Sequence, residues 1–296
     1  MNRQLVFVHG RSQQGKDSKA LKSEWIAAWE QGLSKSGFTL PISDDQIRFP
    51  FYGDTLDQMV GGLSPEAAAG IVVRGEGPLP PSEDKFLGAW LAELKERSGI
   101  GDVEVEEALR VGQTRGVQNW GWVQAILKIV DRKIPGASAL SVAIATRDVY
   151  QYLHNSTFRQ VMDDGVRSAF KAGTETVVVS HSLGTVVAYN VLAKGAPANG
   201  VSVPQFITLG SPLAVTVVKE RINPLVYPSC VENWFNAMDE RDVVALYPLN
   251  ARNFEVVPEI ENKTDVDNDT ANRHGITGYL SDAVVAQRIH QALTTP

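Results

Sequence analysis

The stretch Val177-Val-Val-Ser-His-Ser-Leu-Gly184 decides the fold of this chain. Its valines, preceded by a threonine, form a β-branched run that predicts a buried strand over Thr176 to Val179. A helical pattern over Thr185 to Leu192 begins directly after the glycine. A strand that passes at once into a helix needs a sharp turn, and small residues allow the two elements to approach. A serine in such a turn is either exposed for chemistry or caps the helix, and both interpretations apply to Ser182.

The rest of the chain alternates strands with helices around this turn. Helical periodicity covers Ser18 to Ser36 near the start and Asp282 to Leu293 near the end. This alternation predicts an α/β fold with a mostly parallel central sheet, helices on both faces, and ligands at the carboxyl ends of the strands. Apolar runs predict five further strands, at Leu5 to Val8, Gln46 to Tyr52, Gln205 to Leu209, Val231 to Ala237 and Phe254 to Val257.

Residues 61–145 interrupt the alternation, and we expect a largely helical insertion within a single domain that spans residues 1–296. Helical patterns run over Phe86 to Arg97 and Trp120 to Val130. The second pattern has one apolar face, which suits a mobile lid over an apolar site. We favour a helix packed permanently on the body, because an amphipathic stripe is ordinary core patterning. This face consists of Trp122, Val123, Ile126, Leu127 and Val130.

The composition excludes several kinds of partner and site. With 43% hydrophobic and 21% charged residues, the chain is typical of a globular protein with a packed core. A net charge of -6 provides no basic field, so we expect neither nucleic-acid binding nor stable membrane insertion. Cys230 is the only cysteine, which excludes an intrachain disulfide and a cysteine-based zinc cluster. The apolar run before His9 is too short for a secretory or spanning segment, and we expect a cytoplasmic location.

The turn Ser180-His-Ser-Leu-Gly184 resembles the nucleophile elbow, G-x-S-x-G, of the α/β-hydrolase fold. In this resemblance Ser182 takes the place of the nucleophile, and Gly184 is the small residue that the elbow requires two positions later. Ser180 stands where the family usually has glycine, but serine is still small. The resemblance points to the lipase-like and esterase-like members of the superfamily.

The same resemblance implies an acid and then a histidine later in the chain, because the order in this fold is Ser, Asp or Glu, His. His274 lies in a predicted loop before the closing helix, whereas His290 lies inside that helix, so His274 is the expected base. Asp239 and Asp242 both follow the strand that ends at position 237. We expect Asp242 to be the acid, because its Asp-Val-Val sequence resembles the acid turn of lipase-like members, and Asp239 is the alternative.

The opening loop has two incompatible interpretations. Gly10 to Lys16 reads G-x-x-x-x-G-K after a strand, as a phosphate-binding P-loop does. However, a P-loop then needs Ser or Thr to hold magnesium, and Asp17 in that position would repel a triphosphate. The Val-His-Gly-Arg segment instead resembles the His-Gly loops of lipases and esterases, which implies the backbone N–H groups of Arg11 and Leu183 as oxyanion donors. His9 is then a structural turn residue.

Taken together, these features predict a serine hydrolase that cleaves carboxylic esters through an acyl-enzyme on Ser182. The expected substrate is a small-molecule ester or a lipid-like ester, and the chemistry requires no metal or organic cofactor. A thioesterase, an amidase or an acyltransferase would use the same three residues, so these reactions stay open. The alternatives from other classes are a hydrolase-fold binding protein without catalysis and a P-loop nucleotide-binding protein.

Overall fold

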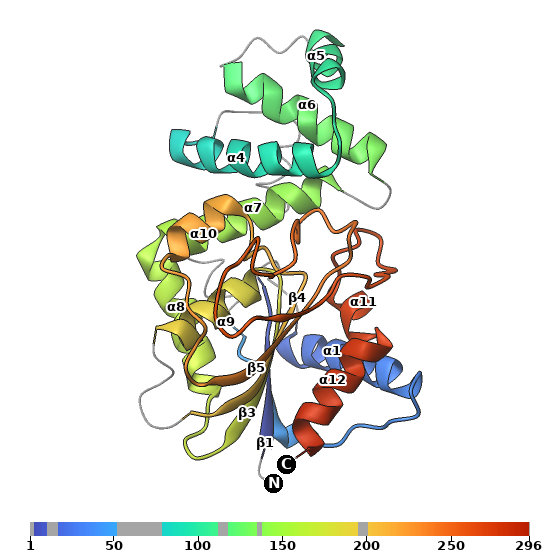
Figure 1. Ribbon diagram of the computed structural model, residues 1–296, viewed down its shortest axis with the longest axis vertical. Coiled ribbons are helices and arrows are strands. Elements are labelled where there is room, and N and C mark those ends of the chain that lie inside the picture. Colours follow the sequence, from blue (N-terminus) through green and yellow to red (C-terminus); the bar gives the residue numbers. More distant parts are fainter. Residues whose placement is uncertain are drawn as a thin grey trace.

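The protein is built on one parallel β-sheet (Figure 1). The computed structural model describes residues 3–10, 17–51, 79–111, 118–134, 138–194 and 201–295. In these ranges six strands form the order β2-β1-β3-β4-β5-β6, and each neighbouring pair is parallel. The predicted α/β class and parallel central sheet are therefore confirmed. The strands are β1 (Arg3–Val8), β2 (Ile47–Arg48), β3 (Glu175–His181), β4 (Val203–Leu209), β5 (Val231–Ala237) and β6 (Glu261–Lys263).

Helices cover both faces of the sheet (Figure 1). One face carries α1 (Ser18–Ser34), α11 (Ile276–Leu280) and α12 (Ala283–Thr294), and a 3-10 turn, η1 (Asp44–Gln46), precedes β2. The other face carries α7 (Ala139–His154), α8 (Ser156–Ala169), α9 (Leu183–Ala193) and α10 (Thr216–Ile222). Beyond α7 lie α4 (Pro81–Arg97), α5 (Asp102–Val111) and α6 (Gln118–Lys133). None of the helices in the described part of the chain has both the length and the apolar character needed to cross a membrane.

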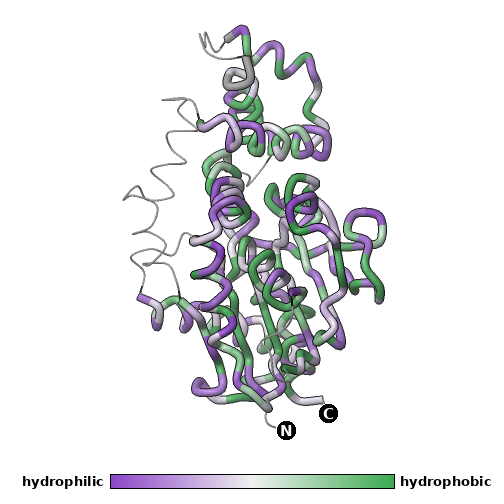
Figure 2. Tube along the Cα trace, turned by 90° about the vertical axis from the view of Figure 1, so that its left-hand side faces the viewer, coloured by the Kyte–Doolittle hydropathy of each residue, from purple (hydrophilic) through white to green (hydrophobic). Residues whose placement is uncertain are grey.

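Alternate residues of each strand pack on opposite faces of the sheet. In β1, Leu5 and Phe7 join the core beneath α1 and α12, whereas Val6 and Val8 join the core on the other side. All four side chains are fully buried. Figure 2 shows that hydrophobic residues gather in the middle of the body. A strand that is buried on both faces reads as a continuous apolar run, which is why the sequence indicated it.

The apolar face expected on the segment 120–130 is a packed face of α6. Val123, Ile126, Leu127 and Val130 are at most 1% exposed. They belong to the same hydrophobic core as side chains of α4 and α7. In the described parts of residues 61–145 the chain is therefore mostly helical, and α6 is held by the core that it helps to form.

The strand expected at Phe254 to Val257 is wrong. Phe254 is buried in a loop, where its ring packs edge-on against Tyr189 and Trp234. Val257 is 87% exposed and precedes Pro258, which has no N–H to donate to a ladder. The apolar signal thus comes from a ring that fills an aromatic cluster. The last strand of the sheet is the short β6, whose sequence is polar.

β2 is also shorter than expected, and the short helices α10 and α11 were not expected at all. The strand predicted at Gln46 to Tyr52 pairs with β1 only over Ile47–Arg48, and Pro50 cannot donate to the ladder. Tyr52 lies outside the described residues. The five-residue helix α11 follows His274 directly and is too short to show a helical period in the sequence.

The start of α9 packs tightly against the end of β1 at Gly184. A Cβ atom at this position would lie 2.8 Å from the backbone of His9 and closer still to the carbonyl oxygen of Val8. Glycine is therefore required by the close approach of a helix to a strand. This contact fixes the end of β1 beside the turn that carries Ser182.

We expect Gly184→Ala to lower the free energy of unfolding by about 1–3 kcal/mol or more, because backbone atoms would have to move apart. Gly101→Ala is the matched control, since a Cβ there meets nothing nearer than Glu104 Oε2 at 3.7 Å. The control should change stability by less than about 1 kcal/mol. Urea unfolding measures both variants, and equal stabilities would contradict the tight packing of α9 on β1.

Candidate active site

Ser182 lies in the sharp turn between β3 and α9, at the carboxyl edge of the sheet. Its backbone has φ 56° and ψ -131°, a conformation that costs a non-glycine residue about 1–3 kcal/mol. Ser182 N donates to Leu209 O at 3.1 Å, and Thr185 N donates to Ser182 O at 2.9 Å. Within this described turn the serine side chain makes no capping hydrogen bond to α9. The strained backbone instead directs the hydroxyl toward His274.

Ser180, two positions before Ser182, is a buried serine whose hydroxyl has a hydrogen-bond partner. Ser180 is fully buried, and its Oγ donates to Ile207 O of the neighbouring strand at 3.1 Å. Because that hydrogen bond satisfies the hydroxyl, a serine fits at this position without leaving a buried polar group unpaired.

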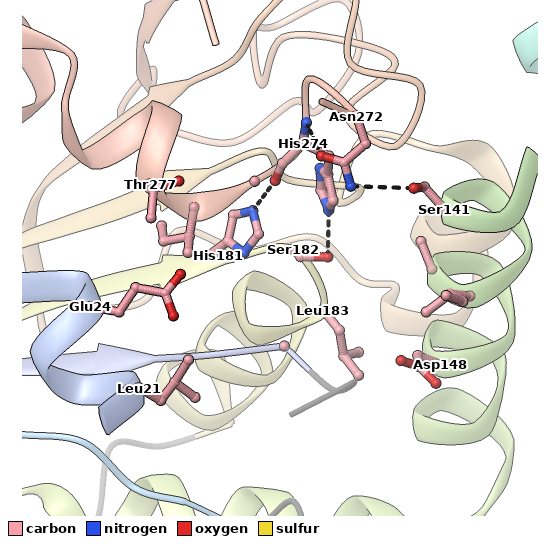
Figure 3. Close-up of a pocket in the computed structure, with 15 residues that line it drawn as sticks. Leu21, Glu24, Ser141, Asp148, His181, Ser182, Leu183, Asn272, His274 and Thr277 are labelled. Atoms are coloured by element: carbon pink, nitrogen blue, oxygen red, sulfur yellow. Dashed lines mark hydrogen bonds between the residues drawn. The ribbon is translucent and has the colours of Figure 1, made fainter. Parts of the chain in front are cut away.

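His274 links the serine to a carboxylate, and Figure 3 shows the half of this link that joins His274 to Ser182. Its Nε2 lies 2.8 Å from Ser182 Oγ, and its Nδ1 lies 2.7 Å from Asp242 Oδ2. A carboxylate only accepts hydrogen bonds, so Nδ1 carries the hydrogen of the neutral imidazole and Nε2 accepts from the serine hydroxyl. The structure thus brings together the three side chains that the sequence singled out, in a continuous chain of hydrogen bonds.

Asp242 is held as a carboxylate by four donors. Its side chain is fully buried, and it accepts from Val244 N at 2.8 Å, Ala245 N at 3.3 Å and Tyr279 Oη at 2.7 Å, besides His274. Burial alone would raise the pKa of Asp242, but the electrostatic and hydrogen-bond contacts with His274, together with the hydrogen bonds from Tyr279 and Val244, outweigh burial and keep this pKa below its ordinary value. The group is therefore a fixed negative charge beside the imidazole.

Two residues that complete this corner were not predicted from the sequence. Burial and the adjacent charge of Asp242 raise the pKa of Tyr279 well above its usual value, so the phenol is a permanent hydrogen-bond donor. Gly210, at the end of β4, has φ 56°, and a Cβ there would lie 3.2 Å from both Asp242 Oδ2 and His274 Cε1. Neither residue could be assigned to the site from the sequence, because the residues that they contact are distant along the chain.

Asp239, the alternative acid, has different partners. It is 1% exposed, and its carboxylate accepts from Arg241 N at 2.7 Å and from Asn268 N at 3.0 Å. Its side chain also pairs with the guanidinium groups of Arg241 and Arg273. The carboxylate of Asp239 therefore binds the backbone and two arginines, while that of Asp242 meets the imidazole.

His181 is a second histidine at the site. Its Nε2 donates to the backbone carbonyl of His274 at 2.7 Å, and the two rings lie 4.8 Å apart (Figure 3). Burial, followed by the charge of His274, lowers the pKa of His181 to about 3. His181 is therefore neutral near pH 7 and holds the loop that carries His274. Its position directly before Ser182 was the only available signal for this contact.

A pocket of about 320 Å³ opens over Ser182. One wall comes from α1, the opposite wall from α7, and the loop of His274 borders the pocket between them (Figure 3). Asn272 Nδ2 donates to Ser141 Oγ at 3.3 Å and so connects that loop to α7. The lining is mixed, with apolar Leu21, Ile144, Ala145, Leu183 and Ile276 beside polar Glu24, Ser141, Asp148, Asn272 and Thr277.

The first turn of α9 faces the end of β1. A Cβ on Gly10 would lie 3.4 Å from Leu183 N, so the predicted donor Leu183 lies beside the loop that begins at Gly10. Arg11, the other predicted donor, and the rest of the segment 11–16 lie outside the described residues. Asp17 caps α1 by accepting from Lys19 N at 3.0 Å. The aspartate that departs from the P-loop pattern thus has a helix-capping contact.

Comparison of the chain with models of protein families, with curated proteins and with solved structures finds no match. Among the described residues, no group of three or more His, Cys, Asp and Glu side chains is arranged to hold a metal ion.

The stability of the protein should fall in mild acid because of His9. This residue is 1% exposed, its ring stacks on Phe49 at 5.2 Å, and burial lowers its pKa to about 4 from 6.5. Below pH 6.5 the unfolded chain binds a proton that the folded protein takes up only near pH 4. The folded state thus loses up to about 3 kcal/mol as the pH falls through this window.

We therefore expect His9→Phe to reduce the loss of stability between pH 7 and pH 4, measured by urea unfolding at several pH values. His290→Phe is the control, because His290 is less buried and its ring lies on α12 against Phe38. An unchanged pH dependence in His9→Phe would show that His9 is not held neutral in the folded protein.

Proposed function

We propose that this chain is a serine hydrolase that cleaves carboxylic esters through an acyl-enzyme. The observation that carries the proposal is the series Ser182, His274 and Asp242, with 2.8 Å and 2.7 Å between the bonded atoms. A serine hydroxyl is a weak nucleophile and needs an adjacent base, and the base needs a group that orients it. All three roles have a candidate at one edge of the sheet.

Each step of the proposed reaction uses an atom of this series. His274 Nε2 takes the proton of Ser182 Oγ as the oxygen attacks the ester carbonyl, and Asp242 stabilises the imidazolium that forms. The imidazolium then donates its proton to the leaving alcohol, which breaks the ester bond and leaves the acyl group on Ser182. Water, deprotonated by the same imidazole, then attacks the acyl group; the bond between the acyl carbon and Ser182 Oγ breaks, the imidazolium returns its proton to Oγ, and the carboxylic acid leaves.

The negative oxygen of the tetrahedral intermediate needs donors, and the start of α9 supplies one. In the proposal, Leu183 N–H is this donor, helped by the positive end of the helix dipole. Arg11 N–H is the second donor, and each such donor contributes about 3 kcal/mol to the stabilisation of the transition state. A Cβ on Gly10 would lie 3.4 Å from Leu183 N, so glycine at this position would leave room for the negative oxygen beside that donor.

We also propose that the chain has the α/β-hydrolase fold. The strained backbone of Ser182, the order Ser182, Asp242, His274 and the parallel sheet all support this assignment. In that fold the serine occupies a sharp turn between a strand and a helix, with an oxyanion donor from the following residue. The helices α4 to α6 would then be an insertion above the α/β body.

The proposed substrate is a small-molecule ester or a lipid-like ester that enters the pocket of about 320 Å³. Apolar side chains such as Ile144 and Ile276 suit the acyl group, while the polar lining suits the ester and its leaving group. Thioesters, amides and acyl transfer would use the same three residues. Rates for p-nitrophenyl esters of increasing chain length, compared with a thioester and an anilide, measure which group the pocket prefers.

The first test is Ser182→Ala, which should reduce ester turnover on the order of 10⁴-fold or more because the nucleophile is absent. A fluorophosphonate should add to Ser182 in the wild type and not in the variant, as measured by intact mass. Ser168→Ala on the exposed surface of α8 is the control and should keep full activity. Comparable turnover by Ser182→Ala would defeat the proposal.

The second test compares the two acids. Asp242→Asn should lower kcat by about 10³-fold to 10⁴-fold, because an amide next to Nδ1 favours the wrong imidazole tautomer. Asp239→Asn keeps the hydrogen bond between Asp242 and His274, so its loss should be far smaller. Steady-state kinetics of both variants decide, and the reverse ranking would assign the role of the acid to Asp239.

A further inference from the structure

The residue directly before His274 has an unusual backbone. Arg273 has φ 56°, in the left-handed region that favours glycine. A residue with a Cβ pays about 1 kcal/mol or more for this conformation. Glycine would avoid this cost at position 273. The contacts of the arginine side chain therefore indicate what arginine contributes there.

One nitrogen of the Arg273 guanidinium, Nη1, has three acceptors nearby. Nη1 donates to Asp267 Oδ1 at 2.8 Å and to Asn268 O at 3.2 Å, and it lies 3.6 Å from Asp239 Oδ2. The side chain is 23% exposed and that of Asp239 is 2% exposed. Arg273 therefore reaches from the loop of His274 to a buried carboxylate on the loop of Asp242.

A second arginine makes the same connection in the opposite direction. Arg241, on the loop of Asp242, lies 3.4 Å from Asp239 and 2.6 Å from Asp267. Asp239, Arg241, Asp267 and Arg273 thus form one ion-pair cluster, with two members on each loop. Asp239 also accepts from the backbone of Asn268, which ties the two loops directly.

We propose that Arg273 is a positioning residue for His274, and that the ion-pair cluster holds the histidine loop against the loop of Asp242. The inference rests on the proposed function, because positioning affects the rate only if His274 is the base. His274 must meet Ser182 and Asp242 at the same time, and a shift of about 1 Å in a reacting group can cost 10²-fold in rate. Asp267 is 83% exposed, so its ion pairs add little to overall stability, and Asp239 keeps Arg241 and two backbone N–H donors when Arg273 is lost. We therefore expect the cluster to act more on geometry than on overall stability.

The decisive variant is Arg273→Gly, because glycine accepts the left-handed backbone and only the side chain is lost. We expect kcat to fall by about 10-fold to 100-fold with KM changed by less than about 3-fold. The rate of fluorophosphonate labelling should fall in parallel, and the melting temperature should change little. Arg273→Lys keeps a charge that can reach one carboxylate and should recover part of the rate.

Two further variants complete the design. Asp239→Asn removes the buried partner, and in combination with Arg273→Gly its effect on kcat should be less than additive, because the two residues act together. Arg252→Gly is the control, since Arg252 is an exposed arginine of another loop. Wild-type kcat in Arg273→Gly, or additive effects in the double variant, would overturn the proposal.

A crystal structure of Arg273→Gly tests the same point without using activity. We expect His274 Nε2 to lie beyond hydrogen-bond distance of Ser182 Oγ, or the histidine loop to be disordered. If the wild type neither hydrolyses esters nor reacts with the probe, the proposed function fails. In that case the crystal structure of Arg273→Gly still tests whether the ion-pair cluster positions His274. An unmoved His274 in the variant would then overturn the positioning role.

Discussion

The hydrogen bond between Ser182 Oγ and His274 Nε2 joins residues that are 92 positions apart in the chain, and the candidate site depends on it. No local sequence holds this pair together. The parallel sheet does, because the carboxyl ends of its strands open at one edge and the loops that follow them meet there. The cores on both faces of the sheet therefore fix the relative positions of Ser182 and His274. Gly184 adds to this constraint by admitting α9 to the backbone of β1.

The side chains around this hydrogen bond are buried, and the carboxylate of Asp242 among them has several hydrogen-bond donors. Burial keeps His9 and His181 neutral, so neither of these two histidines places a positive charge beside His274. Asp242 stays charged at the same edge only because the imidazole, two backbone N–H groups and Tyr279 donate to it. A buried carboxylate without such partners would be costly. The same groups that stabilise the charge also fix its orientation, which links the stability of this corner to its chemistry.

The sequence predicted what depends on local pattern. The turn at Ser182 follows from a strand pattern that runs into a helical one, whereas the choice of Asp242 and His274 comes from the resemblance to the α/β-hydrolase order. The roles of all three residues stay predictions. The strand expected at Phe254 to Val257 failed because tertiary packing, not pairing, explains its apolar residues. The donor Tyr279 carried no signal, since its value lies in one atom placed against a partner 37 residues earlier. Contacts between residues so far apart in the chain can be identified only in the folded structure.

The central claim is that His274 activates Ser182 for attack on an acyl carbon. A crystal structure of the protein after reaction with a p-nitrophenyl alkylphosphonate tests it most directly, because this reagent mimics the tetrahedral intermediate. The account predicts phosphorus bonded to Ser182 Oγ, one phosphoryl oxygen within hydrogen-bond distance of Leu183 N, and His274 Nε2 beside the ester oxygens. An unmodified Ser182, or a phosphoryl group attached to another residue, would contradict it.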